Sequence, residues 1–366
     1  MKFIIKREAL LPALQIVNGV VERRQTLPIL SNFLLSVKQN SLSLAGTDME
    51  VELLTNINQD TGDEGESTLP ARKLLDICRA LPDEADISFN IKGDKAEVRS
   101  GKSRFTLSTL PAAEYPLVEE ATSIVEFKLT QKKLKSLLDR TAFAMAQQDV
   151  RYYLNGLLLE LDGEKLRAVA TDGHRLALCD TDIKTNVDET IQVIVPRKGV
   201  SELIRLLQDS EEAVKVQISS NHIKISWAEL CFTSKLIDGK FPDYNRVVPE
   251  EGSDPIKANR ELLRQSLTRA SILSNEKYKG VRILLEENKL RALAHNPEQE
   301  EAEEEIEVDY HGNEMEIGFN VSYLLDALSI IKTQSVIMTV SDPNSSCLIL
   351  PENEVQSKYV VMPMRL

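Results

Sequence analysis

The segment LRAVATDGHRLALC, residues 166–179, decides the fold class of this chain. Apolar residues alternate with other residues on both sides of Asp172-Gly173. An Asp-Gly pair between two alternating runs is a strong signal for a β-hairpin. We therefore predict two antiparallel strands joined by a tight turn. The turn also carries His174 next to Asp172 and Arg175, which raises the question of a catalytic His-Asp pair.

The hairpin belongs to a segment that occurs three times. The copy NGLLLELDGEKLRAVATDGHRLAL begins at Asn155, and similar copies begin at Asn32 (NFLLSVKQNSLSLAGTDMEVEL) and, more faintly, at Gly280 (GVRILLEENKLRALAHNPEQEEAE). Each copy is typical of three strands with two turns. Thr47-Asp48 corresponds to Thr171-Asp172, but only the middle copy continues with Gly-His-Arg. The middle copy is therefore a specialised version of a repeated structural unit.

Helical periodicity flanks each copy. Pro70 and Pro196 are predicted in the first turn of a helix, where proline is tolerated, and Asn320 is a predicted N-cap. The predicted helices are residues 7–18, 70–81, 130–145, 196–207, 259–273 and 320–332. The predicted fold is α+β, with three repeated domains that each contain two helices and antiparallel sheets. The predicted domains are residues 1–120, 121–252 and 253–366, with polar, acidic joints near 119–122 and 250–254.

Composition narrows the class of protein. With 366 residues and 42% hydrophobic residues, the chain is long and apolar enough for several packed cores. Its start lacks the continuous apolar run of a signal peptide, and no segment has the length of a membrane span, so we expect a cytoplasmic protein without a membrane partner. Its cysteines are far apart and without a C-x-x-C pair, which favours reduced thiols over disulfides or zinc. They are Cys78, Cys179, Cys231 and Cys347.

Charge is distributed unevenly between the predicted elements. The net charge is −13, which alone argues against a polyanionic partner. The six predicted helices nevertheless contain 15 basic and six acidic residues, a net charge of +9, which leaves −22 for the rest of the chain. One interpretation is that the basic helix surfaces only keep the protein soluble. The other is that helices from all three repeats face the phosphates of a duplex without reading its bases. Domains of this size have a diameter of about 35 Å, so six of them in a ring would leave a hole wide enough for DNA.

Many segments resemble one family, the beta subunit of bacterial DNA polymerase III, or sliding clamp. They include TLPILSN, GTDMEVE, PARKLLDICRALP, QQDVRYYLNG, ATDGHRLA, FTSKLIDGKFPDY, NPEQEEAEE and the terminal YVVMPMRL, and the similarity runs from Met1 to Leu366. The resemblance implies a non-catalytic processivity factor without cofactor or metal: a head-to-tail homodimer with a six-domain ring that encircles double-stranded DNA. It also implies a clamp loader that opens the ring, and short motifs through which the polymerase core, other polymerases and repair proteins bind.

The resemblance implies a hydrophobic groove for partner peptides on the middle and last repeats. Small, branched and thioether side chains suit a pocket that accepts many sequences. Without the resemblance, VVMPMRL would be interpreted as a final core strand. We predict that replacing His174 and Arg175 impairs peptide binding without unfolding the chain or dissociating the dimer. The implied groove residues are Leu154, Thr171, Gly173, His174, Arg175, Leu176, Pro242, Arg246, Val247, Val360, Val361, Met362, Pro363, Met364 and Leu366.

The resemblance also implies DNA-contacting residues. Arg24 lies in VERRQTLP, where the family often has glycines before the arginine. Tyr152 and Tyr153 could instead be strand aromatics, and then at most one of them would be buried, since neighbours in a strand point to opposite faces. The implied DNA-binding residues are Arg24, Arg72, Arg79, Gln148, Tyr152, Tyr153, Arg197 and Lys198.

For the dimer, the resemblance implies that Ile272 and Leu273 pack against Leu107 of the other chain. Two adjacent large apolar residues at a helix end cannot both use its core face, which supports an additional surface. Without the resemblance, the acidic run PEQEEAEEEIEVD, residues 297–309, would be interpreted as a solvent-exposed face. The charged residues implied at the interface are Lys73, Arg104, Glu298, Glu301 and Glu304.

Enzyme hypotheses find little support. The side chains of His174 and Asp172 flank a turn and need not converge, and no Ser or Cys nucleophile occurs in a G-x-S-x-G context. Gly101-Lys102-Ser103 ends like a phosphate-binding loop, but the glycine required five residues earlier is Ala96. The remaining histidines, His222, His295 and His311, are isolated. A DNA-encircling scaffold is therefore favoured over a protein interaction platform or a hydrolase.

Overall fold

A computed structural model of the chain describes residues 1–21, 27–38, 41–58, 62–118, 122–185, 187, 189–250, 252 and 254–365. The chain folds into two compact units. Unit 1 contains residues 1–132 and 201–236, and unit 2 contains residues 133–200 and 237–366. The division falls inside helices α3 (Gln131–Asp139) and α4 (Arg197–Leu206). The middle repeat therefore contributes to both units.

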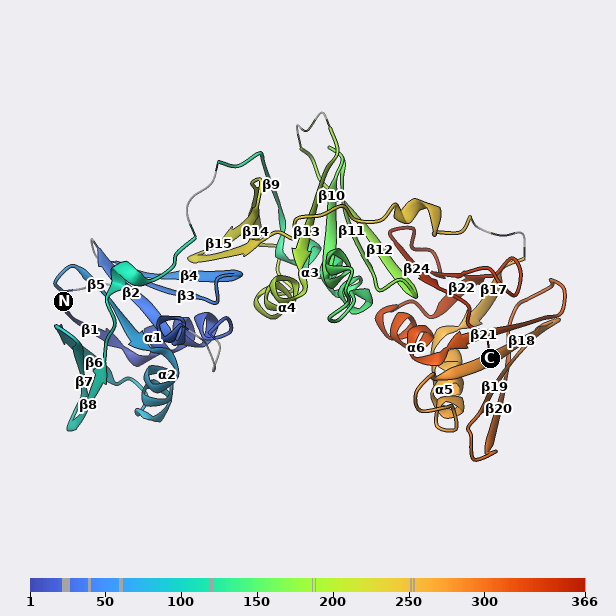
Figure 1. The fold of residues 1–366 in the computed structure, drawn as a ribbon, viewed down its shortest axis with the longest axis horizontal. Coiled ribbons are helices and arrows are strands. Elements are labelled where there is room, and N and C mark those ends of the chain that lie inside the picture. The colour runs from blue at the N-terminus through green and yellow to red at the C-terminus, as the bar shows by residue number, and fades with distance from the viewer. Residues whose placement is uncertain are drawn as a thin grey trace. The chain divides into compact units, whose positions relative to one another are not determined.

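Unit 1 contains one eight-stranded and one four-stranded antiparallel sheet, with two complete helices and parts of α3 and α4 (Figure 1). Its elements are β1 (Lys2–Lys6), α1 (Arg7–Val17), η1 (Pro28–Ser31), β2 (Asn32–Lys38), β3 (Ser41–Thr47), β4 (Val51–Asn58), β5 (Gly65–Pro70), α2 (Ala71–Ala80), β6 (Asp86–Lys92), β7 (Lys95–Ser100), β8 (Ser103–Ser108), η2 (Ala112–Glu114), β9 (Val125–Thr130), β14 (Ala213–Ile218), β15 (His222–Trp227) and β16 (Leu230–Lys235). The strand orders are β5-β2-β3-β4-β16-β15-β14-β9 and β1-β6-β7-β8. Strands of the first and middle repeats thus join into one sheet at the β4–β16 pair.

Unit 2 has the same construction. Its elements are η3 (Ala142–Ala144), η4 (Tyr152–Asn155), β10 (Gly156–Leu161), β11 (Lys165–Thr171), β12 (Arg175–Asp182), β13 (Ile191–Pro196), η5 (Tyr244–Arg246), β17 (Ile256–Asn259), α5 (Arg260–Ser271), β18 (Gly280–Glu286), β19 (Lys289–His295), β20 (Glu301–Glu307), β21 (Met315–Asn320), α6 (Val321–Ile330), β22 (Ser335–Thr339), β23 (Cys347–Pro351) and β24 (Ser357–Val361). The strand orders are β13-β10-β11-β12-β24-β23-β22-β17 and β20-β19-β18-β21. Here the middle and last repeats join at the β12–β24 pair.

The predicted α+β architecture is confirmed. Each copy of the repeated segment forms a three-stranded meander, namely β2-β3-β4, β10-β11-β12 and β18-β19-β20. Alternating burial in β18 and β19 shows how one face of each strand packs into the core while the other stays more open. All six predicted helices are present in the described residues, and Asn320 caps α6 by accepting a hydrogen bond from Ser322 N at 2.9 Å.

Two details of the predicted helices were wrong. The helix predicted over residues 130–145 ends at Asp139, because Thr141 has a non-helical backbone (φ −124°) and a 3-10 turn follows it. Pro70 and Pro196 end the strands β5 and β13 and do not lie in the first helical turn. Both strands are sheet edges, where a residue without an N–H does not break a ladder of hydrogen bonds.

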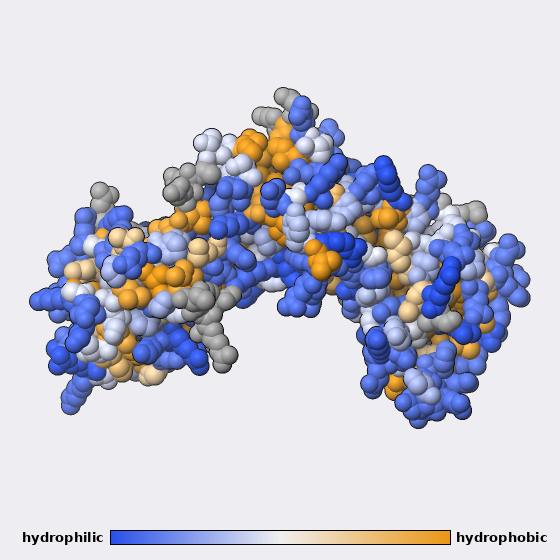
Figure 2. Space-filling model, in the orientation of Figure 1, coloured by the Kyte–Doolittle hydropathy of each residue, from blue (hydrophilic) through white to orange (hydrophobic). Residues whose placement is uncertain are grey.

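The surface is mostly polar. On the face drawn in Figure 2, hydrophilic residues predominate and hydrophobic residues gather in small patches. Within the part of the chain that the structure describes, no helix is long and apolar enough to span a membrane. The predicted boundaries of the three repeats stay predictions, and residues 119–121, 251 and 253 of the predicted joints lie outside the described residues.

Candidate functional site

The turn between β11 and β12 is held by its own side chains. Asp172 Oδ1 accepts hydrogen bonds from the backbone N–H groups of His174 (2.9 Å) and Arg175 (3.0 Å). The hydroxyl of Thr171 donates to Arg175 O at 2.6 Å. Gly173 occupies the left-handed region with φ +87°, which glycine adopts without strain. The predicted hairpin is confirmed, and its Asp and Thr have a structural function.

The first repeat contains the same turn. Asp48 Oδ1 accepts from Glu50 N (2.8 Å) and Val51 N (2.7 Å), and the hydroxyl of Thr47 donates to Val51 O at 3.0 Å. Met49 has the positive φ there, at +75°. The predicted correspondence between Thr47-Asp48 and Thr171-Asp172 is therefore confirmed. In this alignment Val51 takes the place of Arg175.

These contacts also argue against a catalytic pair in the hairpin. The second carboxylate oxygen of Asp172 accepts from Arg175 Nε at 3.2 Å. The His174 ring stacks instead on Tyr323, with 6.3 Å between the ring centroids and 19° between the planes. The carboxylate thus shapes the turn and holds an arginine, which are structural functions.

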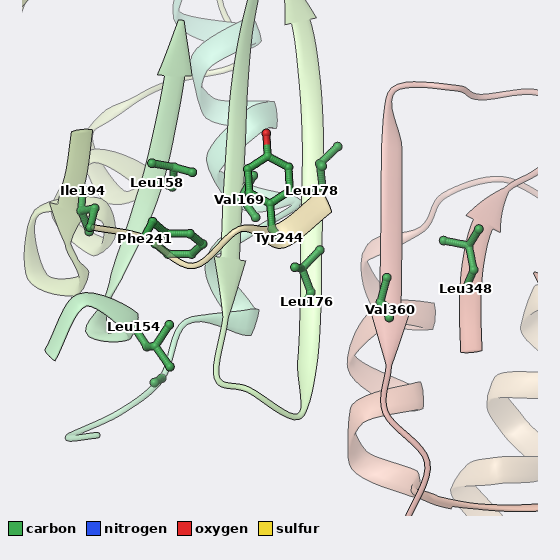
Figure 3. Close-up of a cluster of buried hydrophobic side chains, with 11 residues drawn as sticks. Leu154, Leu158, Val169, Leu176, Leu178, Ile194, Phe241, Tyr244, Leu348 and Val360 are labelled. Atoms are coloured by element: carbon green, nitrogen blue, oxygen red, sulfur yellow. The ribbon is translucent and has the colours of Figure 1, made fainter. Parts of the chain in front are cut away.

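An apolar cluster lies beside the hairpin, where β12 pairs with β24 (Figure 3). It brings together three of the predicted groove residues, Leu154, Leu176 and Val360, which are at most 3% exposed. We call this set the junction cluster. Its other members are Ala146, Leu158, Val169, Leu178, Ile194, Phe241, Tyr244 and Leu348, and the half-buried Tyr153, Ile237, Val248 and Leu350 pack against it.

The segment that begins at Ile237, where the chain re-enters unit 2, forms one side of the junction cluster. Phe241 and Tyr244 lie over the strands β10, β11 and β12 (Figure 3). The Tyr244 hydroxyl donates to Glu160 Oε1 at 2.6 Å and accepts from Arg167 Nη1 at 3.1 Å, and burial raises the pKa of Tyr244 to about 12. Hydrogen bonds at a half-buried site of this kind fix the position of the segment.

Exposed residues of the same segment border the junction cluster. Pro242 and Arg246 are exposed, and Val247 is 36% exposed. Arg246 Nε lies 2.9 Å from Asp243 Oδ2. These predicted groove residues therefore form a solvent-facing rim next to the buried apolar side chains.

The C-terminal tail begins at the hairpin. Met362 N donates to His174 O at 2.9 Å, and Met362 and Pro363 are half-buried. Met364 N donates to Gly318 O at 2.8 Å, and Met364 lines a separate hollow of about 310 Å³ with Tyr278, Leu293 and His295. Val361 is 1% exposed and follows Val360 in a strand, so its side chain points to the opposite face. Leu366 lies outside the described residues.

Arg175 is held on several sides. Its side chain is 13% exposed and forms an ion pair with Asp326 in addition to Asp172. Nη2 donates to Phe143 O at 2.8 Å. The guanidinium carbon lies 4.7 Å from the ring centroid of Tyr323 and 5.3 Å from that of Phe143, within the range of cation–π contact.

Sequence reasoning missed several of these residues. Alternation along β10 and β12 would have added Leu158 and Leu178 to the cluster, because side chains two residues apart share a face. Phe143, Tyr323 and Asp326 carry no local signal, because their contacts with Arg175 join segments up to 151 residues apart.

The predicted DNA-binding residues differ in accessibility. Arg72 and Arg79 are exposed on α2 and line a hollow of about 260 Å³. Gln148 is exposed in a loop with φ +54°. Lys198 and Arg197 are half-buried, and Arg197 Nη1 donates to Met145 O at 3.0 Å, so part of its guanidinium serves the fold. Arg24 lies outside the described residues.

Tyr152 and Tyr153 differ in exposure, although they belong to a 3-10 turn and not to a strand. Tyr152 is 57% exposed, whereas Tyr153 packs on the junction cluster. Their ring centroids are 5.7 Å apart in an edge-on arrangement. One aromatic ring is therefore available to a ligand.

The predicted apolar dimer residues lie at the end of helix α5 and on the edge strand β8. Ile272, just after α5, is 73% exposed and Leu273 is half-buried. Leu107, in the edge strand β8, is only 7% exposed and so has little surface to offer, whereas Phe105 on the same face is half-buried and was missed by the sequence reasoning.

The charged dimer residues are partly engaged within the chain. Arg104 pairs with Glu97, and Glu304 lies 2.5 Å from Arg269 Nη2. Lys73, Glu298 and Glu301 are exposed.

Little else among the described residues suggests metal or thiol chemistry. No group of three or more His, Cys, Asp or Glu side chains there could hold a metal ion. Burial raises the pKa of the Cys78 and Cys347 thiols to about 12, so they stay protonated at neutral pH. A hollow of about 680 Å³ lies on the eight-stranded sheet of unit 1 and includes Glu52, His222 and Cys231.

Comparison with known proteins identifies the family of this chain. Residues 1–119, 128–243 and 245–365 match the N-terminal, central and C-terminal domains of the DNA polymerase III beta subunit. The chain is 54% identical to the beta sliding clamp of Pseudomonas aeruginosa and 52% identical to that of Escherichia coli, with 100% of each chain covered. A crystal structure of a Pseudomonas aeruginosa sliding clamp bound to griselimycin has a TM-score of 0.97, 54% identity and full coverage of both chains. The chain therefore belongs to the DNA polymerase III beta subunit family, the beta sliding clamps.

Proposed function

We propose that this sliding clamp, a non-catalytic processivity factor of DNA polymerase III, tethers its partners through a groove formed by the junction cluster and its rim. The observation that carries the proposal is the convergence of Leu154, Leu176 and Val360, from three distant segments, at one apolar site. Exposed Val247 and Pro242 beside that site provide a surface for a peptide. The partners are the polymerase core, the clamp loader, other polymerases and repair proteins, and we place the protein in the cytoplasm.

The proposed groove should bind weakly. Burying two apolar peptide side chains contributes at most about 3 to 6 kcal/mol, and ordering the peptide offsets part of this. A single apolar groove can therefore exchange one partner for another. Such exchange suits a platform that several proteins share.

Double-stranded DNA is held by charge and not by base contacts. The helices as observed contain 13 basic and six acidic residues, a net charge of +7 in a chain of −13. Exposed Arg72 and Arg79 on α2 are the strongest candidates for phosphate contacts among the described residues. Phosphate contacts fix a protein on DNA without sequence preference.

The head-to-tail dimer would join two sheet edges. Strand β8 ends the sheet β1-β6-β7-β8 and strand β20 ends the sheet β20-β19-β18-β21. Unpaired edge strands are templates for pairing with another chain. Arg104 lies on β8, whereas five of the seven residues of β20 are glutamates, so the two edges also carry opposite charge. Ile272 and the half-buried Phe105 are the candidate apolar contacts.

Encirclement of DNA can be tested directly. The protein would be loaded by a clamp loader onto a nicked circular duplex, and the circle would then be cut once. We expect the protein to remain on circles and to leave linear DNA through the ends. Retention on linear DNA would contradict the topological model.

The groove can be tested with griselimycin, which is bound in the structure of the Pseudomonas aeruginosa relative. Val247→Asp places a charge on the exposed rim and should weaken binding measured by calorimetry. Val355→Asp is the matched control, since Val355 is 92% exposed and precedes the opposite end of β24. Equal affinities of the two variants would refute the assignment of the groove.

A further inference from the structure

Arg175 was predicted to be a groove residue, but its guanidinium is already engaged. It contacts the carboxylates of Asp172 and Asp326, the carbonyl of Phe143 and the ring of Tyr323. Its side chain is 13% exposed. A guanidinium has five N–H donors in a planar fork, and all three nitrogens of this one donate to these partners.

The turn itself does not require this arginine. The first repeat forms the same turn, with the same bonds from an Asp and a Thr, and has Val51 in place of Arg175. The contacts of Arg175 with Asp326, Tyr323 and Phe143 are therefore additional to the turn. They need another explanation.

These contacts join the tip of the hairpin to the last repeat. Asp326 and Tyr323 lie on α6, and the His174 ring stacks on the same Tyr323. His174 O in turn accepts the hydrogen bond from Met362 N, where the C-terminal tail begins. Arg175 thus holds the hairpin tip, α6 and the start of the tail in one arrangement beside Leu176 of the junction cluster.

We propose that Arg175 is a positioning residue, which keeps the wall of the peptide groove in its binding conformation through the ion pair with Asp326. Partner peptides would meet His174 and the apolar side chains and not the guanidinium. A wall that is already ordered loses less entropy when a peptide binds. The inference rests on the proposed groove, since it concerns the same site.

Asp326→Ala separates this function from direct peptide contact. If Arg175 positions the wall, loss of its carboxylate partner should weaken griselimycin binding about tenfold, the usual effect of losing one hydrogen bond to a charged group. If Arg175 contacts the ligand directly, the released guanidinium should leave the affinity unchanged or increase it. That result would overturn the inference. Asp326 is 48% exposed, so the substitution removes no buried side chain.

Two further variants test the same pair. Asp326→Glu retains a carboxylate and should keep most of the affinity. Arg175→Lys should resemble Asp326→Ala, because an ammonium cannot reproduce the planar contacts of a guanidinium. In the double variant the two effects should not add, and full additivity would overturn the inference.

Glu261→Ala is the matched control for Asp326→Ala. Glu261 is a helix carboxylate on α5, 42% exposed, that lies 2.7 Å from Arg264 Nη2. Glu261→Ala should leave the affinity for griselimycin unchanged. Hydrogen exchange of the backbone at residues 172–176 should increase only in Asp326→Ala. Unchanged exchange there would count against the inference. Absence of griselimycin binding in the wild-type protein would instead refute the proposed groove itself.

Discussion

Ile272→Ala should weaken the dimer without destabilising the chain. Ile272 follows α5 with 73% of its surface exposed, which is unusual for an isoleucine at the end of a helix. Full burial of such a side chain stabilises by about 1.5 to 3 kcal/mol, so the truncation should cost about 1 to 2 kcal/mol at each interface. A head-to-tail dimer has two such interfaces. The expected loss is about 2 to 4 kcal/mol, or about 30-fold to 900-fold in the dimer Kd.

Sedimentation over a range of concentrations measures this Kd. Leu262→Ala is the matched control, because Leu262 is 56% exposed on the same helix but was not predicted at the interface. Its Kd should equal that of the wild-type protein. The thermal unfolding of the Ile272→Ala monomer should also be unchanged, since an exposed side chain contributes little to the core. An unchanged dimer Kd would show that Ile272 faces solvent in the dimer and that the proposed interface is misplaced.

Other predictions concern DNA, pH and the hairpin. Arg72→Glu and Arg79→Glu should each weaken loading of the protein onto circular DNA and reduce the salt slope of log K for DNA binding by about 1, whereas Lys38→Glu, on β2, should do neither. Burial raises the pKa of Glu52 above its ordinary value of 4.5, so the charged carboxylate is the less stable form in the folded chain. Glu52→Gln should therefore have a higher Tm than the wild-type protein. The difference in Tm should grow as the pH rises above 4.5 and then level off. Equal Tm values for the variant and the wild-type protein at every pH from 4 to 8 would contradict this. Gly173→Ala should cost about 1 to 2 kcal/mol, because alanine at a φ of +87° is strained, and calorimetry should show weaker griselimycin binding with an intact dimer.

The structure also modifies the prediction for the hairpin double variant. Replacing His174 and Arg175 together would remove an exposed ring that stacks on Tyr323 and a guanidinium that holds the hairpin to α6. Both changes should lower peptide affinity, but for different reasons. Asp326→Ala alone reproduces only the second effect.

The sequence by itself determined the repeated unit and its local elements. Alternating side chains, an Asp-Gly turn and Asn320 as N-cap act over a few residues, so they are readable without the fold. The correspondence of Thr47 and Thr171 could be found for the same reason. The resemblance to the family then added the groove residues, of which Leu154, Leu176 and Val360 do converge.

Tertiary structure alone decided how the repeats join and which side chains are free. The pairing of β12 with β24 brings Arg175 opposite Val361. No local sequence pattern predicts the strand register between residues so far apart in the chain. Arg175 also forms an ion pair with Asp326, a contact that the local sequence does not reveal, and this contact is the basis for proposing a positioning function for a predicted groove residue. Burial of Leu107 beside half-buried Phe105 is likewise set by packing within the sheet and not by the sequence of β8. Contacts between distant segments depend on the three-dimensional arrangement of strands, and a single sequence does not specify that arrangement residue by residue.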